Sequence, residues 1–236
     1  MPAERLPPIT LVRQFDTHRL IPSHHTPSGD SVLVDVAAND ADLPAIFELD
    51  AATNDRLLAG QQRLPGIGLE ELVFGVPHAA VVNAAFCHAH PLGGRFNGPE
   101  RGAWYAAFEL STAHAEVGFH KAVQLNEVGR FEDSMTFDDY LADFSVSLHD
   151  LRRTRAFSDC LDPESYVASQ DLAERLLSAG SLGVVYPSVR VKTGTCVACF
   201  RPALVGNVRL DRTYRFTWDG TPKPTVRVED RPGEIT

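Results

Sequence analysis

The sequence predicts a globular α+β protein, and two observations favour this prediction. Segments with helical and with strand-like spacing of apolar residues are interspersed along the chain, without the regular strand–helix alternation of a doubly wound sheet. Hydrophobic residues make up 44% of the 236 residues, so the chain can bury a sizeable core and global disorder is excluded. We expect one large domain with an elaborated end or insert.

The charge and composition exclude several kinds of partner. The formal charge of −9, from 22 basic and 31 acidic residues, argues against direct nucleic-acid binding and against attraction to anionic lipid. No apolar run approaches the roughly 20 residues that cross a bilayer. The first ten residues lack an apolar signal segment, and the four cysteines fit a reducing compartment. We therefore expect a cytoplasmic protein without a membrane or nucleic-acid partner; a homo-oligomer is compatible with the sequence.

The first third of the chain predicts an arm, a strand and a helical insert. Prolines near the start predict a loosely held arm over residues 1–16. Alternating apolar residues in TLVRQFDTHRLIPS then predict a strand that ends at Pro22. After a polar loop, apolar residues with helical spacing predict a helical insert at about 40–80, although its second half, 60–78, is irregular because it is rich in glycine and proline.

The middle of the chain alternates between regular and irregular segments. VVNAAFCH fits a helix or a strand, whereas PLGGRFNGPERG is a loop. AWYAAFEL predicts a strand, and Ser111 or Thr112 is expected to cap the helix that follows, STAHAEVGFHKAVQL.

The last part of the chain predicts strands around one helix. Residues 131–151 contain strand-like alternation, and SQDLAERLLSAG predicts a helix that stops at Gly180. LGVVYPSVR, CVACF and VGNVRL predict short strands. We expect the main domain to span 17–203, followed at 204–236 by a strand and a frayed, proline-rich tail.

Several catalytic signatures are missing from the sequence. It contains no G-x-G-x-x-G, no phosphate-binding P-loop, no G-x-S-x-G and no H-E-x-x-H motif. Cys196 and Cys199 have C-x-x-C spacing but no second pair, and their apolar surroundings favour buried thiols over a zinc or redox site. No metal site is predicted.

One segment, Gly93–His120, combines residue types that suit a nucleotide. Arg95 in a glycine-rich loop can grip phosphate oxygens with its fork of donors. Tyr105 can stack on a planar heterocycle, and Glu116 can stabilise positive charge that develops on a sugar carbon. Taken singly, such residues more often have ordinary surface, packing or helix-terminus roles than functional ones, so the pattern alone does not establish a site.

The same segment resembles the RES domain family. The resemblance is carried by GGRF at 93–96, WYAA at 104–107, LSTAHAE at 110–116, and LGVVYPSVR at 182–190, which contains Ser188. HRLIPS at 18–23 resembles the arginine-containing strand that opens longer members. The similarity runs from about residue 17 to about 202, and Phe96 stands where many members have tryptophan.

The resemblance implies a fold, a substrate and roles for five residues. RES domains resemble ADP-ribosyltransferases, with a mixed β-sheet core, flanking helices and a cleft for NAD, which is a substrate and not a bound cofactor. The implied catalytic residues are Glu116, Ser188, Arg95 and Tyr105, and the implied substrate-binding residues are Arg19, Arg95, Tyr105 and Ser188. Glu116 is expected to stabilise the ribosyl cation, and Ser188 to position the nicotinamide ribose or carboxamide.

The implied activity has three alternatives. The first is an NAD-degrading toxin of a bacterial toxin–antitoxin pair, which cleaves the nicotinamide–ribose bond by hydrolysis or phosphorolysis and is neutralised by a cognate antitoxin protein. The second is an ADP-ribosyltransferase that modifies a protein. The third is an inactive RES module that only binds a nucleotide or a partner. Retention of Arg95, Glu116 and Ser188 argues against the third.

Overall fold

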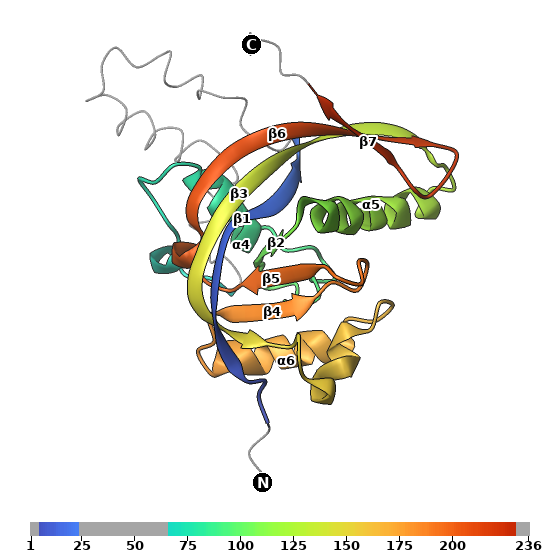
Figure 1. The fold of residues 1–236 in the computed structure, drawn as a ribbon. Coiled ribbons are helices and arrows are strands. Elements are labelled where there is room, and N and C mark those ends of the chain that lie inside the picture. The colour runs from blue at the N-terminus through green and yellow to red at the C-terminus, as the bar shows by residue number, and fades with distance from the viewer. Residues whose placement is uncertain (1–4, 24–65, 230–236) are drawn as a thin grey trace, which may run out of the picture.

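The computed structural model describes residues 5–23 and 66–229, which form a mixed β-sheet flanked by helices (Figure 1). The sheet has seven strands in the order β1-β2-β5-β4-β3-β6-β7, and β1 also pairs with β3. The strands are β1 (Ile9–Pro22), β2 (Trp104–Ala107), β3 (Glu132–Asp150), β4 (Gly183–Pro187), β5 (Thr195–Cys199), β6 (Gly206–Asp219) and β7 (Thr225–Glu229). The predicted α+β class is confirmed.

The pairing of the strands closes part of the sheet on itself. β3 and β4 are parallel, whereas the other neighbouring strands are antiparallel. β1 meets β2 at a single pair, His18 with Ala107, but runs beside β3 from Ile9 to Pro22. The long strands β1, β3 and β6 therefore curve around the shorter ones, as Figure 1 shows.

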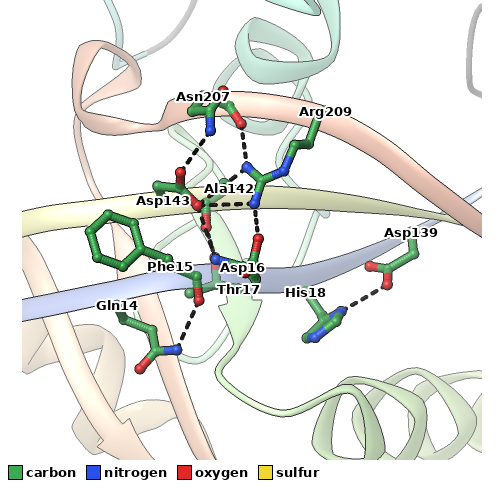
Figure 2. A network of polar contacts seen from close by, with 10 residues as sticks. All are labelled: Gln14, Phe15, Asp16, Thr17, His18, Asp139, Ala142, Asp143, Asn207 and Arg209. Atoms are coloured by element: carbon green, nitrogen blue, oxygen red, sulfur yellow. Dashed lines mark hydrogen bonds and ion pairs between the residues drawn. The ribbon is translucent and has the colours of Figure 1, made fainter.

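An irregularity in β1 is held by a polar network on β3 and β6. The register with β3 shifts between Gln14 and Thr17, and Asp16 there has a positive φ of 54°. The Asp16 backbone N–H donates to Asp143 at 2.9 Å, and Arg209 forms ion pairs with both aspartates (Figure 2). This bulge sets the register of the following residues, which include His18 and Arg19.

Three α-helices of the described residues cover the sheet: α4 (Ala79–Cys87), α5 (Leu110–Glu127) and α6 (Val167–Ser178). Short 3-10 turns, η2 (Leu69–Glu71), η3 (Arg155–Leu161) and η4 (Pro202–Leu204), join the other elements. Each of these helices is too short or too polar to cross a lipid bilayer.

Two apolar clusters fill the spaces between sheet and helices. One joins α5 and α6 to the sheet and includes Leu172, Leu176 and Phe216, all of them completely buried. The other lies against α4 and includes Phe86 and Trp104. Burial on both faces of β5 explains why CVACF reads as a continuous apolar run.

Several predicted elements need correction. The prediction of a loosely held arm over residues 1–16 is wrong from Ile9 onward, because β1 begins there. The strand also crosses the predicted domain boundary after residue 16. The frayed tail is wrong at Thr225–Glu229, because this segment pairs with β6. The segment that fitted either helix or strand is helix α4, and most of the insert predicted at about 40–80 lies outside the described residues.

The expected cap of α5 is also wrong. Glu109, not Ser111 or Thr112, is the N-cap residue, and the helix begins at Leu110. The Glu109 carboxylate instead accepts hydrogen bonds from the Thr112 hydroxyl at 2.9 Å and from the Thr195 backbone N–H at 3.1 Å. These contacts tie the start of α5 to β5.

Candidate active site

A pocket of about 660 Å³ opens between β1, α5 and the loop that follows α4. We call it the α5 pocket. Its walls contain every predicted site residue with one exception, which is described below. The lining side chains that bear polar or aromatic groups are His18, Arg19, His90, Arg95, Tyr105, Glu116, His120, Gln124, Glu127, Tyr166, Tyr186 and Cys196.

One face of α5 forms a wall of the pocket. The α5 residues that line it recur every three or four positions, as one face of an α-helix requires: 113, 116, 117, 120, 123, 124 and 127. Glu116 lies in the N-terminal half of this row. A helix therefore places the carboxylate beside the other walls without a flexible loop.

The glycine loop has a backbone that side chains would block. Gly93 has φ 71°, and a Cβ on Gly94 would lie 2.6 Å from Asn97 Oδ1 and 2.9 Å from the Tyr105 hydroxyl. The loop is held by Gln170 of α6, whose side-chain amide donates to the carbonyl oxygens of Leu92 and Gly94 at 2.9 and 3.0 Å. The glycines thus permit close approach of loop, strand and helix.

Tyr105 fastens the same loop to β2. Its hydroxyl donates to Asn97 Oδ1 at 2.7 Å and accepts from the Phe96 backbone N–H at 2.8 Å. Burial raises the pKa of this phenol, so it stays protonated as a donor at neutral pH. Phe96 is fully buried and packs edge-on against Tyr186, with ring centroids 4.7 Å apart. An aromatic residue at position 96 therefore anchors the loop in the core.

Arg95 is a buried cation held by neutral groups. One of its terminal nitrogens, Nη1, donates to the carbonyl oxygens of Cys160 and Asp162 at 3.2 and 2.7 Å. Its guanidinium carbon lies 4.6 Å from the centroid of the Tyr166 ring. Within the described residues it pairs with no carboxylate, so Glu100 is not its partner. The positive charge faces a pocket without a neutralising contact.

Arg19 is a second cation of this kind. It donates to the Tyr105 carbonyl oxygen at 3.0 Å, and its guanidinium carbon lies 4.8 Å from the Trp104 ring centroid. Its Nε is buried and has no hydrogen-bond partner among the described residues. Burial lowers the Arg19 pKa to about 10 from 12.5, with the Tyr105 hydroxyl opposing that shift. An anion bound beside it would satisfy the charge.

Glu116 is oriented by Ser188. The Ser188 hydroxyl donates to Glu116 Oε1 at 2.6 Å and accepts from the backbone N–H groups of Arg190 and Val191 at 3.0 and 3.1 Å. Ser188 is buried behind the carboxylate and is the exception, because it does not line the pocket. The geometry gives Ser188 a positioning role toward Glu116.

Both basic and acidic side chains lie near Glu116. His120 lies one helical turn beyond it, and burial lowers the His120 pKa, with Glu116 opposing the shift and Arg190, Arg95 and His90 reinforcing it. His120 is therefore held toward its neutral form. The pocket combines two guanidinium groups with the carboxylates of Glu116 and Glu127, which suits a ligand with a phosphate end and an end that becomes positive.

The pocket brings together four of the five predicted site residues, Arg19, Arg95, Tyr105 and Glu116, and the fifth, Ser188, contacts one of them. Sequence reasoning missed His18, His120 and Gln170. The i, i+4 spacing of Glu116 and His120 could have indicated His120, whereas nothing local indicated that Gln170 would reach the glycine loop.

Cys196 and Cys199 are free, buried thiols on β5. Burial raises the pKa of both, to about 12 for Cys199. Across residues 5–23 and 66–229, no cluster of three or more histidine, cysteine, aspartate or glutamate side chains could hold a metal ion. Cys196 also contributes to the pocket wall, where its Sγ lies 3.9 Å from Glu116 Oε1.

Comparison with known proteins places the chain in a family. The family model of the RES domain matches residues 72–219, more than half of the chain, so the chain belongs to the RES domain family. The match contains Arg95, Tyr105, Glu116 and Ser188, but not β1 with Arg19.

Among solved structures, the chain is similar to one titled "Crystal structure of the M.tuberculosis MbcT-MbcA toxin-antitoxin complex". The two chains share 12% sequence identity over 89% of this chain and 87% of that chain, with a TM-score of 0.49. A comparison with curated protein sequences finds no match.

Proposed function

We propose that the protein cleaves the bond between nicotinamide and ribose in NAD, with water or phosphate as acceptor. One observation carries the proposal: a carboxylate fixed by Ser188 lines the same pocket as two arginines that have no carboxylate partner among the described residues. NAD has the matching charges, a pyrophosphate dianion and a ribose carbon that becomes cationic when nicotinamide leaves.

Binding would use the two guanidinium groups. Arg95 and Arg19 have charges that the surrounding carbonyl oxygens and aromatic rings only partly satisfy. A pyrophosphate would accept hydrogen bonds from both and would supply the missing counter-charge. The ring of Tyr105, whose hydroxyl is engaged by the loop, would offer its face to the nicotinamide.

Catalysis would depend on charge and position. Nicotinamide leaves as a neutral molecule, so the leaving group needs no proton, and the protein must mainly stabilise the ribosyl cation and orient the ribose. Glu116 would supply the negative charge, and the Ser188 hydroxyl would keep it in place. The chemistry in this form requires no metal ion.

We further propose that this activity makes the protein the toxin of a toxin–antitoxin pair. Its membership of the RES domain family supports this role. An enzyme that drains NAD harms its own cell, so a neutralising protein partner is expected. An acidic segment of that partner could occupy the arginine end of the pocket and exclude NAD by competition.

The direct test is to incubate purified protein with NAD, with and without phosphate, and to identify the products by mass spectrometry. We expect free nicotinamide together with ADP-ribose, or with its 1″-phosphate when phosphate is the acceptor. EDTA should leave the rate unchanged. Release of nicotinamide only when a protein acceptor is added would instead indicate an ADP-ribosyltransferase, and NAD binding without turnover would indicate an inactive module.

A further inference from the structure

His18 and Asp139 form a hydrogen-bonded pair at the wall of the α5 pocket. His18 Nδ1 lies 2.8 Å from Asp139 Oδ2, as Figure 2 shows. His18 lines the pocket and keeps 17% of its side chain exposed, whereas Asp139 is completely buried. A buried carboxylate therefore holds a histidine ring that borders the substrate space.

The register of β1 and β3 creates this pair. Leu20 pairs with Asp139 and His18 pairs with Leu141, so His18 and Asp139 are diagonal neighbours on one face of the sheet. Arg19 lies between His18 and Leu20 in the sequence. Its side chain extends from β1 to the Tyr105 carbonyl and the Trp104 ring. One strand thus contributes both a cation and a histidine to the pocket.

The surroundings direct Asp139 toward His18. Its second oxygen, Oδ1, is buried and has no hydrogen-bond partner in the described part of the chain. His114 of α5 and Tyr214 of β6 interact electrostatically with Asp139, and their rings pack edge-on with centroids 4.7 Å apart. Burial lowers the pKa of His114 and raises that of Tyr214, so neither carries a charge near neutral pH.

We propose that His18 is the general base for the acceptor, with Asp139 as its positioning residue. This inference rests on the proposed cleavage of NAD. Asp139 would keep the proton on His18 Nδ1, which leaves the lone pair of Nε2 for the pocket. The bond between ribose C1′ and nicotinamide breaks with its electron pair going to the nicotinamide nitrogen. As water oxygen bonds to C1′, His18 Nε2 takes one of its protons and later returns it to solvent.

A purely structural role explains the pair less well. Backbone pairing with β3 already holds β1 on both sides of His18. A buried carboxylate with one unpartnered oxygen costs folding free energy, and an apolar pair at these positions would avoid that cost. The orientation of a histidine toward a pocket is the benefit that such a contact provides.

The test compares the wild type with His18→Gln and Asp139→Asn by following nicotinamide release over pH 5–9. Wild-type kcat should rise with pH, because a histidine accepts a proton as a general base only in its neutral form. His18→Gln should lower kcat by about 10²–10⁴-fold and remove this rise, with little change in KM for NAD. Two matched controls, Asp138→Asn and His149→Gln, alter a neighbouring aspartate and a histidine that do not line the pocket, and both should keep the rise.

A rescue experiment separates a base from a structural residue. Azide is a nucleophile that needs no deprotonation, so it should restore nicotinamide release in a folded His18→Gln variant and yield ADP-ribosyl azide. If His18→Gln does not fold, as judged by circular dichroism, Asp139→Asn provides the same comparison. A variant that keeps the wild-type pH profile would show that His18 is not the general base, and so would a variant that azide does not rescue. Either result would leave the proposed cleavage of NAD intact. A wild-type protein that releases no nicotinamide overturns the proposed function and this inference together.

Discussion

The Ser188 hydroxyl donates a 2.6 Å hydrogen bond to Glu116 Oε1, joining two residues 72 positions apart in the sequence. The Ser188 hydroxyl oxygen also accepts hydrogen bonds from the backbone N–H groups of Arg190 and Val191, and these contacts fix the direction of the single hydroxyl proton. The loop after β4 thereby sets the direction of a carboxylate on α5. Catalysis by Glu116 should consequently depend on a serine that does not line the pocket.

Replacing Ser188 by alanine tests that dependence. Ser188→Ala should lower kcat for nicotinamide release by up to about 10²-fold, because a misplaced catalytic group can cost that much. It should also reduce the free energy of unfolding by about 1–3 kcal/mol, since two backbone N–H groups lose their acceptor.

Ser181→Ala is the matched control. Ser181 is a buried serine that contacts His149 at 2.9 Å and does not line the pocket. The control should be destabilised with an unchanged kcat. Equal losses of kcat in both variants would mean that Ser188 acts only through stability.

Removing the Tyr105 hydroxyl separates two roles of this residue. Tyr105→Phe keeps the ring for stacking but deletes both hydrogen bonds to the Gly93–Asn97 loop. A freer loop should hold Arg95 less well, so KM for NAD should rise and kcat should change less. Steady-state kinetics checks this split, and an unchanged KM would show that the Gln170 contacts alone position the loop.

The ion pairs of Glu71 predict a pH-dependent contribution to stability. Hydrogen bonds from Arg101 chiefly, with Arg201 contributing, lower the Glu71 pKa from 4.5 to about 2. A lowered carboxylate pKa stabilises the folded state above the unfolded value, and this contribution is lost as pH falls from about 4.5 to about 2.

The measurement compares wild type with Glu71→Gln by denaturant unfolding. The variant should be less stable at pH 7, and the difference should shrink as pH falls below about 4.5. Its kcat should stay unchanged, because Glu71 does not line the pocket. If the difference in stability between the two proteins were constant across pH, the ion pairs of Glu71 would not be its cause.

The proposed toxicity predicts a cellular phenotype. Expression of the wild-type protein should arrest growth and lower cellular NAD, and co-expression of the protein encoded beside it should restore both. Arg95→Ala should abolish toxicity, although loss of the Arg95 contacts to Cys160 and Asp162 also weakens the fold. Glu116→Gln is therefore the better control, because it keeps shape and hydrogen bonding. Harmless expression of soluble wild-type protein with unchanged NAD would contradict the toxin proposal.

The strands and helices with strong patterns could be predicted from the sequence, and so could the grouping of the motifs. β1 and α6 follow alternating and helical spacing, and the separated segments around Arg95, Glu116 and Ser188 carried the family resemblance that the match over residues 72–219 confirms. The pocket itself could not be predicted, because it depends on how distant elements meet.

The misses have physical causes. Thr225–Glu229 is polar and follows prolines, yet it pairs with β6 because an edge strand needs only one partner and can face water on both sides. The predicted start of α5 is wrong because the Thr112 hydroxyl, expected to cap the helix, donates to the Glu109 carboxylate instead. The same carboxylate accepts a hydrogen bond from β5. The contact of His18 with Asp139 spans 121 residues and follows from the register of two long strands, which no local pattern encodes.

The central claim is tested most directly by nicotinamide release from NAD by the wild type and by Glu116→Gln, measured side by side with their melting temperatures. The exchange removes the charge proposed to stabilise the ribosyl cation but leaves an oxygen to accept the Ser188 hydrogen bond. We predict release by the wild type, a loss of about 10²–10³-fold in the variant, by analogy with the loss of one electrostatic contact in other enzymes, and nearly equal melting temperatures. A variant that releases nicotinamide at the wild-type rate would contradict the account.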